Sequence, residues 1–127
     1  MHTTYLCSVR EESLKKIIKN NCYCLESHWQ KKIEKLKLGD YLVYYVTGDK
    51  KVMAFVEVVS PVFIQSGEAK VKIKLKEALE NGINFKDFVK KLDFIKDSEK
   101  WGTYLQVPLR KLSEKDAKTI LKIFDKK

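Results

Sequence analysis

Two neighbouring runs of β-forming residues constrain the fold more than any other feature of this sequence. One begins at Tyr41 and reads YLVYYVTG, and the other begins at Val52 and reads VMAFVEVVS. The short polar segment 48–51, with sequence GDKK, separates them. Strand-forming runs joined by so short a connection predict an antiparallel β-hairpin.

A third run, AKVKIKLKEAL over residues 69–79, alternates apolar and polar residues with a period of two. This period predicts a strand with Val71, Ile73 and Leu75 facing the core. Four lysines are then expected to face outward. The usual explanation of such a stripe is the solvated face of an antiparallel sheet, and a track for phosphate groups is the alternative. The stripe consists of Lys70, Lys72, Lys74 and Lys76.

Shorter elements are predicted on both sides of these strands. Ser113 with Asp116, and Asn84 with Asp87, have the spacing of helix N-terminal capping pairs. Short helices between strands predict an α+β fold, with a mostly antiparallel sheet curled into a small barrel. No repeat or linker divides the chain, so residues 1–127 are expected to form a single domain. The flanking elements are a strand over 3–8, a helix over 11–20, a helical turn over 31–36, a helix over 85–92, a strand over 101–109 and a helix from 114 whose buried stripe ends at Phe124.

The formal net charge of +9 favours a polyanionic partner, most commonly nucleic acid. Arg10 and Arg110 are the only arginines among the basic residues. Because lysine attracts phosphate as a point charge whereas arginine suits bidentate reading of guanine, this balance favours backbone affinity over major-groove readout. The alternative is a composition like that of heat-adapted proteins, whose Lys- and Glu-rich surfaces carry ion-pair networks.

The three cysteines make a disulfide framework improbable, and the N-terminus shows no secretory pattern, so a reducing cytoplasm is the expected location. No apolar run approaches the roughly 20 residues of a membrane span. Cys22, Cys24 and His28 resemble part of a metal site, but a fourth ligand is missing and the spacing is not that of a zinc knuckle. The glycines stand singly, without a phosphate-binding motif. We therefore expect neither a metal nor a cofactor.

The segment YLCSVREESLKKIIKNNCYCLESHWQKKIEKLKLGDYLVYYVTGDKKVMAFVEVVS, followed later by KWGTYLQVPLRKLSEKD, resembles an EVE domain over nearly the whole chain. That family has a PUA-like barrel fold and is related to ASCH domains and to the YTH readers of methylated adenine. The resemblance implies a non-enzymatic module that binds nucleic acid and accommodates one modified base in an aromatic pocket. It leaves both RNA and modified DNA open as the partner.

The same resemblance implies a set of pocket residues. Ser8 is expected to offer its hydroxyl or its backbone amide to a base edge. Relatives commonly have a tryptophan-glycine pair after the first helix, and here Tyr23 and Cys24 match it, so Tyr23 retains an aromatic face at this position. His28 and Trp29 are candidates for a second wall, although packing of Trp29 over the barrel mouth is an equal alternative.

Two further candidates lie near the C-terminus. Trp101 with Gly102 matches a late tryptophan-glycine pair of the family, and Trp101 either contacts the ligand or supports the pocket from behind. Arg110, which follows Pro108, is a candidate for a phosphate or base contact, with a surface ion pair as the alternative.

Two other functions fit the sequence less well. A metal-independent ribonuclease would use His28 and nearby lysines, since such activity is proposed for some PUA-like relatives. A protein-interaction module would dock an acidic partner on the lysine-striped strand.

Overall fold

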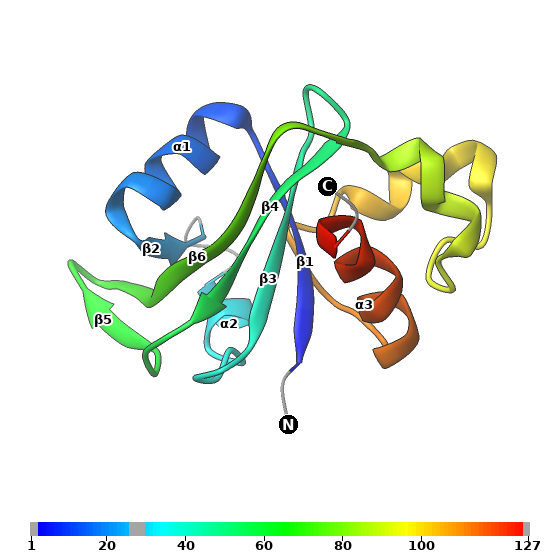
Figure 1. Cartoon of the computed structure of the whole chain (residues 1–127). Coiled ribbons are helices and arrows are strands. Elements are labelled where there is room, and N and C mark those ends of the chain that lie inside the picture. Colours follow the sequence, from blue (N-terminus) through cyan, green and yellow to red (C-terminus); the bar gives the residue numbers. More distant parts are fainter. Residues whose placement is uncertain (1–2, 26–29, 126–127) are drawn as a thin grey trace.

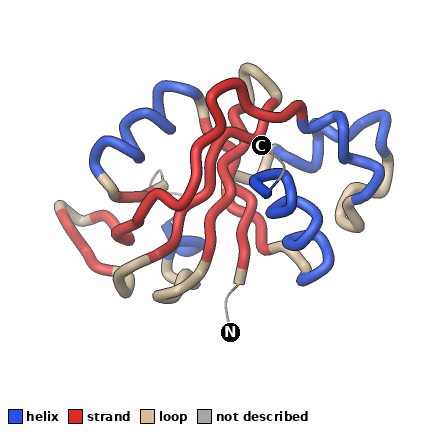
Figure 2. Tube along the Cα trace, in the orientation of Figure 1, coloured by secondary structure: helices blue, strands red, loops and turns tan. Residues whose placement is uncertain are grey.

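The structure is a computed structural model that describes residues 3–25 and 30–125. One curled sheet crosses the molecule, with helices packed on both sides of it (Figures 1 and 2). The strand order is β2-β6-β4-β3-β1-β7, and β5 pairs with β6 outside this path. The strands are β1 (Thr4–Val9), β2 (Cys22–Cys24), β3 (Tyr41–Val46), β4 (Lys51–Val58), β5 (Phe63–Gln65), β6 (Glu68–Asn84) and β7 (Leu109–Lys111). The helices are α1 (Glu11–Asn20), α2 (Gln30–Ile33) and α3 (Glu114–Leu121), with 3-10 segments η2 (Phe85–Lys91), η3 (Ser98–Leu105) and η4 (Lys122–Asp125).

The sheet is antiparallel except at one place. Strands β1 and β3 are parallel neighbours, with Thr4 opposite Tyr41 and Val9 opposite Val46. The intervening chain, including α1 and α2, makes the crossover that parallel neighbours require. The predicted hairpin is confirmed as β3 and β4. The α+β architecture with a mostly antiparallel, curled sheet is therefore confirmed.

Helix α1 has the predicted bounds because its ends are well specified. Arg10 precedes it in an extended conformation, and Asn21 ends it with a positive φ of 53°. Asparagine tolerates this left-handed conformation better than most residues. Leu14 is buried, and Ile17 and Ile18 are half-buried against the sheet.

Two separate apolar cores cover the two faces of the sheet. Because successive strand residues point to opposite faces, Tyr44 and Tyr45 of β3 enter different cores. Tyr44 belongs to the core on the α1 side, and Tyr45 belongs to the core shared with η2, η3 and α3.

The last third of the chain differs from its prediction. The expected strand over 101–109 is wrong, because η3 occupies Ser98–Leu105 and only β7 remains extended. Asp97 starts η3 by accepting a hydrogen bond from the Glu99 amide at 3.0 Å. The spacing of Trp101, Tyr104 and Leu105 is helical, and it places all three side chains against one core.

Two side-chain predictions also need correction. Leu75 is exposed rather than buried, although it pairs with Val56 in the same register that places the buried Ile73 opposite Val58. Asn84 precedes η2, but its side chain makes no capping hydrogen bond.

The second capping pair is confirmed in part. The Asp116 amide donates to the Ser113 Oγ at 3.2 Å, as expected of an N-cap. The Asp116 carboxylate instead accepts from the amides of Asp93 and Phe94, at 2.9 and 3.3 Å. It thereby ties the segment before η3 to α3. Within the described ranges, no helix has the length and apolarity needed to cross a membrane.

Candidate functional site

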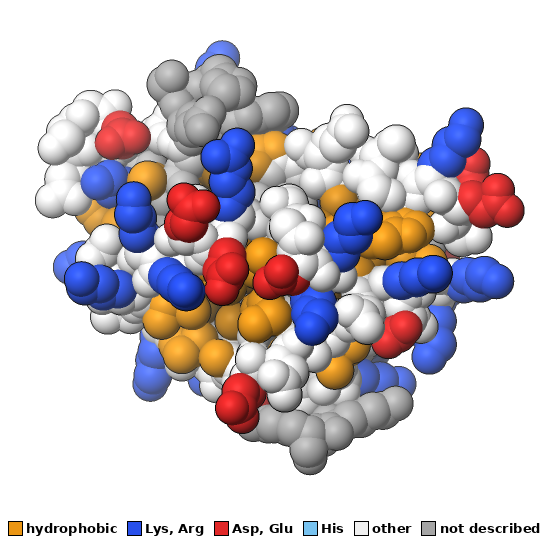
Figure 3. Space-filling model, turned by 90° about the horizontal axis from the view of Figure 1, so that it is seen from above, with side chains coloured by type: hydrophobic (Ala, Val, Ile, Leu, Met, Phe, Trp, Pro, Cys, Tyr) orange, Lys and Arg blue, Asp and Glu red, His pale blue; other side chains and the backbone are white. Residues whose placement is uncertain are grey.

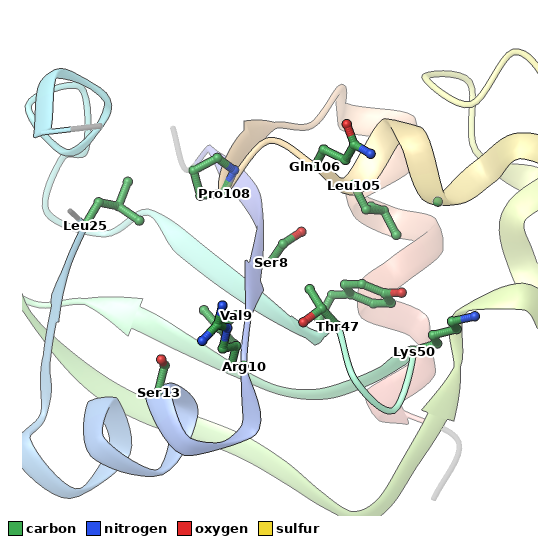
Figure 4. Close-up of a pocket in the computed structure, with 12 residues that line it drawn as sticks. Ser8, Val9, Arg10, Ser13, Leu25, Thr47, Lys50, Leu105, Gln106 and Pro108 are labelled. Carbon is green, nitrogen blue, oxygen red and sulfur yellow. The ribbon is translucent and has the colours of Figure 1, made fainter. Parts of the chain in front are cut away.

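An open cleft of about 720 Å³ lies at the carboxyl ends of the parallel strands β1 and β3. Figure 4 shows its residues arranged around the end of β1. Ligands of open sheets commonly bind in the crevice outside the carboxyl ends of parallel strands. The lining residues come from β1, α1, β3, the β3–β4 turn, η3 and the adjoining connections: Ser8, Val9, Arg10, Ser13, Leu25, Tyr45, Thr47, Lys50, Gly102, Leu105, Gln106 and Pro108.

The charge of this cleft is one-sided. Arg10 and Lys50 line it, and both residues are exposed. Among the described residues, its lining includes no carboxylate, imidazole or thiol. The cleft therefore attracts anions.

The polar side chains of the cleft have unused hydrogen-bonding capacity. The Ser8 backbone amide donates to the Pro108 carbonyl at 3.1 Å, so only the Ser8 hydroxyl is available to a ligand. Figure 4 shows that this hydroxyl points toward the side of the cleft where Leu105 and Gln106 lie. The side chains of Ser8, Ser13, Thr47 and Gln106 make no hydrogen bond to another residue in the described part of the chain.

Tyr45 forms a largely buried wall of the cleft. Its ring packs edge-on against Phe85, with centroids 5.2 Å apart at 68°. Burial raises the pKa of the Tyr45 hydroxyl, so this group stays protonated and able to donate at neutral pH.

Trp101 lies behind this wall. Its ring is half-buried, meets Tyr45 edge-on with centroids 6.4 Å apart, and is tilted by 32° against Phe85 at 5.5 Å. The neighbouring Gly102 lines the cleft, whereas Trp101 is not among the lining residues. Trp101 thus packs behind Tyr45 without lining the cleft, and its role as support for the pocket stays a prediction.

The structure places Tyr23 away from the cleft. Tyr23 is 1% exposed and packs edge-on against Tyr44, with centroids 5.7 Å apart. Burial is the main reason that the pKa of its hydroxyl is raised, and the neighbouring Cys7 thiol raises it further. Tyr23 and Trp101 belong to cores on opposite faces of the sheet, so they do not enclose a common slot.

Arg110 lies in β7, opposite Leu6 of β1. Its guanidinium donates to the Tyr104 carbonyl at 3.1 Å and lies over the Phe94 ring, 5.0 Å from the centroid. Arg110 is not among the lining residues of the cleft. The remaining two candidates, His28 and Trp29, lie outside the described residues.

Sequence reasoning missed several cleft residues, including Arg10, Tyr45, Lys50 and Gln106. No local sequence pattern indicates that β1 and β3 are parallel neighbours, and this pairing brings their ends together. Tyr45 stands in a run of strand-forming residues, and nothing else in the sequence distinguishes it. Arg10 is distinguished in the sequence by its charge alone.

The rest of the titratable chemistry is dispersed. In residues 3–25 and 30–125, no three or more His, Cys, Asp or Glu side chains gather as metal ligands would. Cys7 is fully buried, and burial raises the pKa of its thiol above the ordinary range. Seen from the end of the molecule where β1 finishes, basic side chains surround patches of apolar surface, and fewer acidic ones lie among them (Figure 3).

Comparison with known proteins agrees with this architecture. The chain is 25% identical over 135 residues to the UPF0310 protein PYRAB08750 of Pyrococcus abyssi, with coverage of 91% of this chain and 95% of that protein. The solved structure of Rpa0253 from Rhodopseudomonas palustris superposes with a TM-score of 0.71 at 15% identity, covering 97% of this chain and 93% of that one.

A YTH domain has a similar fold. The domain from the Zygosaccharomyces rouxii MRB1 protein, solved with N6-methyladenosine RNA, superposes with a TM-score of 0.74 at 12% identity, covering 99% of this chain and 86% of that one. This likeness confirms the PUA-like fold prediction. The model of the EVE domain family matches residues 5–123. The chain therefore belongs to the EVE domain family.

Proposed function

We propose that this protein is a non-enzymatic nucleic-acid-binding module that takes a single nucleobase into the cleft at the ends of β1 and β3. The observation that carries this proposal is a cleft with two cations, no described acidic group and several unpaired hydrogen-bonding side chains. Such a lining suits a ligand that combines negative charge with a polar, flat edge.

The lining offers both kinds of contact that an extruded base needs. Extrusion costs a few kcal/mol, which contacts to the base face and edge must offset. Leu105 and the Tyr45 ring provide apolar surface, and the Ser8 hydroxyl with the Gln106 amide can pair with a base edge. In this arrangement Trp101 does not contact the base; it packs against Tyr45 and holds that ring in place.

The cations then hold the phosphates that flank the base. Arg10 stands at the start of α1, and Lys50 stands in the β3–β4 turn. Because both side chains are exposed, their contribution is expected to weaken as salt rises.

The structural likeness to a YTH domain solved with N6-methyladenosine RNA supports a modified base as the first ligand class to test. Burying one methyl group contributes about 0.8 kcal/mol, so a fitted apolar wall can distinguish a methylated base from a plain one. RNA and methylated DNA both belong in the test.

Catalysis has less support. A general acid or base needs a titratable group within reach of the ligand. Of the described lining residues, only Arg10, Lys50 and Tyr45 carry ionisable side chains, and burial raises the pKa of the tyrosine. We therefore propose binding without turnover.

The test is fluorescence anisotropy with labelled trinucleotides of RNA and DNA, plain or methylated on adenine or cytosine. We expect the Arg10→Ala/Lys50→Ala variant to bind more weakly, with the loss greatest at low salt. The matched control is Lys90→Ala/Lys96→Ala, which removes the same charge from two exposed lysines outside the cleft. Equal losses in both variants, or no trinucleotide binding by the wild type, would refute the proposal.

A further inference from the structure

A second groove of about 560 Å³ lies at the other end of α1. Lys72 and Lys74 contribute two cations, and no acidic residue lines the groove within the described part of the chain. Its lining combines amide side chains, cations and the half-buried ring of Phe63. The lining residues are Asn20, Asn21, Cys22, Val59, Phe63, Gln65, Lys72, Ile73 and Lys74.

The backbone around this groove is well fixed. Lys72 lies opposite Cys22 in the pairing of β6 with β2. The Lys72 amide also donates to the Ser60 Oγ at 2.9 Å. Lys72 and Lys74 are exposed, so their ammonium groups are directed to solvent from an ordered strand.

Helix α1 connects the two grooves. Its start contributes Ser13 to the first cleft, and its end contributes Asn20 to the second groove. The helix has 10 residues, and a helix of that length spans about 15 Å. Figure 1 shows α1 running from the end of β1 to β2.

The first turn of α1 carries two exposed acidic residues, Glu11 and Glu12, and the exposed side of the helix is basic after that turn. Lys16 and Lys19 are exposed between the two grooves. Lys15 is also exposed and lies 3.6 Å from the Glu11 carboxylate. Exposed cations thus lead from the second turn of α1 to the second groove, while Glu11 and Glu12 lie between them and the first cleft.

We propose that the second groove binds phosphates of the same single strand whose base enters the first cleft, with the strand following α1 between them. This inference rests on the proposed function. At about 3.4 Å per nucleotide in a stacked strand, the separation corresponds to about four nucleotides. Two lysines and one aromatic ring, with no acidic group in the described lining of the second groove, favour a nucleic acid over a folded protein surface.

The first experiment compares oligonucleotide lengths. A trinucleotide reaches only one groove, whereas an octanucleotide reaches both, so the wild type should bind the octanucleotide more tightly. The Lys72→Ala/Lys74→Ala variant should lose this gain and keep its trinucleotide affinity. The control Lys90→Ala/Lys96→Ala should keep both affinities.

Salt dependence gives a quantitative readout. Single strands show a slope of about 0.7 per neutralised phosphate in a plot of log affinity against log salt. Removing two contacts should therefore reduce the octanucleotide slope by about 1.4, so that the wild type loses about sevenfold more affinity than the variant between 50 and 200 mM salt.

A second experiment uses Cys22 as a reporter. Cys22 is half-buried and lines the second groove, Cys24 is exposed, and Cys7 is fully buried. In a Cys24→Ser background, the octanucleotide should slow alkylation of Cys22, and the trinucleotide should not.

The outcomes separate this inference from the proposed function. If trinucleotides bind but octanucleotides gain nothing and leave Cys22 unprotected, the second groove has no such role and the first cleft still stands. If neither length binds, both proposals fail. If polyglutamate protects Cys22 as well as an octanucleotide of equal charge does, the groove belongs to an acidic protein and the inference is overturned.

Discussion

Trp101 and Tyr45 meet edge to face, with ring centroids 6.4 Å apart, and only Tyr45 lines the cleft. Tyr45 thus forms part of the wall of the candidate site, and Trp101 packs behind that ring without lining the cleft. Their contact also links η3, which carries Trp101, to the end of the parallel strand β3.

Replacing Trp101 should therefore affect stability and binding together. We expect Trp101→Ala to lower the free energy of unfolding by about 2 kcal/mol, less than for a fully buried ring. Loss of support for Tyr45 should weaken trinucleotide binding by about tenfold. Trp101→Phe is the control and should recover most of both quantities, measured by urea denaturation and anisotropy. A Trp101→Ala variant with normal affinity would show that the wall needs no support.

Removing the Ser8 hydroxyl should change binding alone. The Ser8 amide, which bonds to Pro108, stays in place in Ser8→Ala. Loss of one hydrogen bond to a ligand should cost about 1 kcal/mol, or about fivefold in affinity, with unfolding unchanged. Ser98→Ala, in a half-buried serine outside the cleft, is the control. Equal affinities of both variants would remove Ser8 from the site.

Replacing Arg110 should lower stability and leave binding unchanged. Its guanidinium bonds to the Tyr104 carbonyl and lies over Phe94, and lysine cannot reproduce both contacts. Arg110→Lys should lower the free energy of unfolding by about 1 to 2 kcal/mol while trinucleotide affinity stays unchanged. A selective loss of affinity at normal stability would instead make Arg110 a ligand contact.

Sequence reasoning recovered the elements that local pattern determines. The bounds of α1, the hairpin of β3 and β4, and the burial of Val71 and Ile73 all follow from periodicity and turn chemistry. The prediction of a strand over 101–109 is wrong because the same segment also contains the helical spacing of Trp101, Tyr104 and Leu105.

The candidate site was harder to predict because it depends on contacts between distant segments. Its position results from the parallel pairing of β1 with β3, which no local pattern encodes. Tyr23 and Trp101 lie on opposite faces because they pack against Tyr44 and Tyr45, consecutive residues of β3 whose side chains point to opposite faces of the sheet. Ser8 was identified through the family resemblance and does line the cleft.

The buried thiol and phenols make stability sensitive to alkaline pH. Burial raises the pKa of Cys7, Tyr23 and Tyr44 above their unfolded values. The folded state therefore retains protons that the unfolded state releases, so stability is fully present below the unfolded pKa and is lost as pH rises above it.

The loss should begin at about pH 9, where an unfolded cysteine ionises, and should reach about 1.4 kcal/mol per pH unit for each group. Urea denaturation between about pH 8 and 11 measures it. Cys7→Ala, which removes one of these groups, should show a shallower decline between about pH 9 and 10. An identical decline in wild type and variant would contradict the assignment to Cys7.

The most direct test of the cleft fills it from a position that tolerates a side chain. Gly102 lines the cleft, and a Cβ added there meets no atom within 4 Å. Gly102→Leu should therefore fold normally while its side chain occupies the space proposed for the base. Gly48→Leu is the matched control, since Gly48 is equally unobstructed and does not line the cleft. The measurement is the trinucleotide affinity of the two variants: we predict that Gly102→Leu loses binding and Gly48→Leu retains it, and full binding by a folded Gly102→Leu protein would contradict the proposed site.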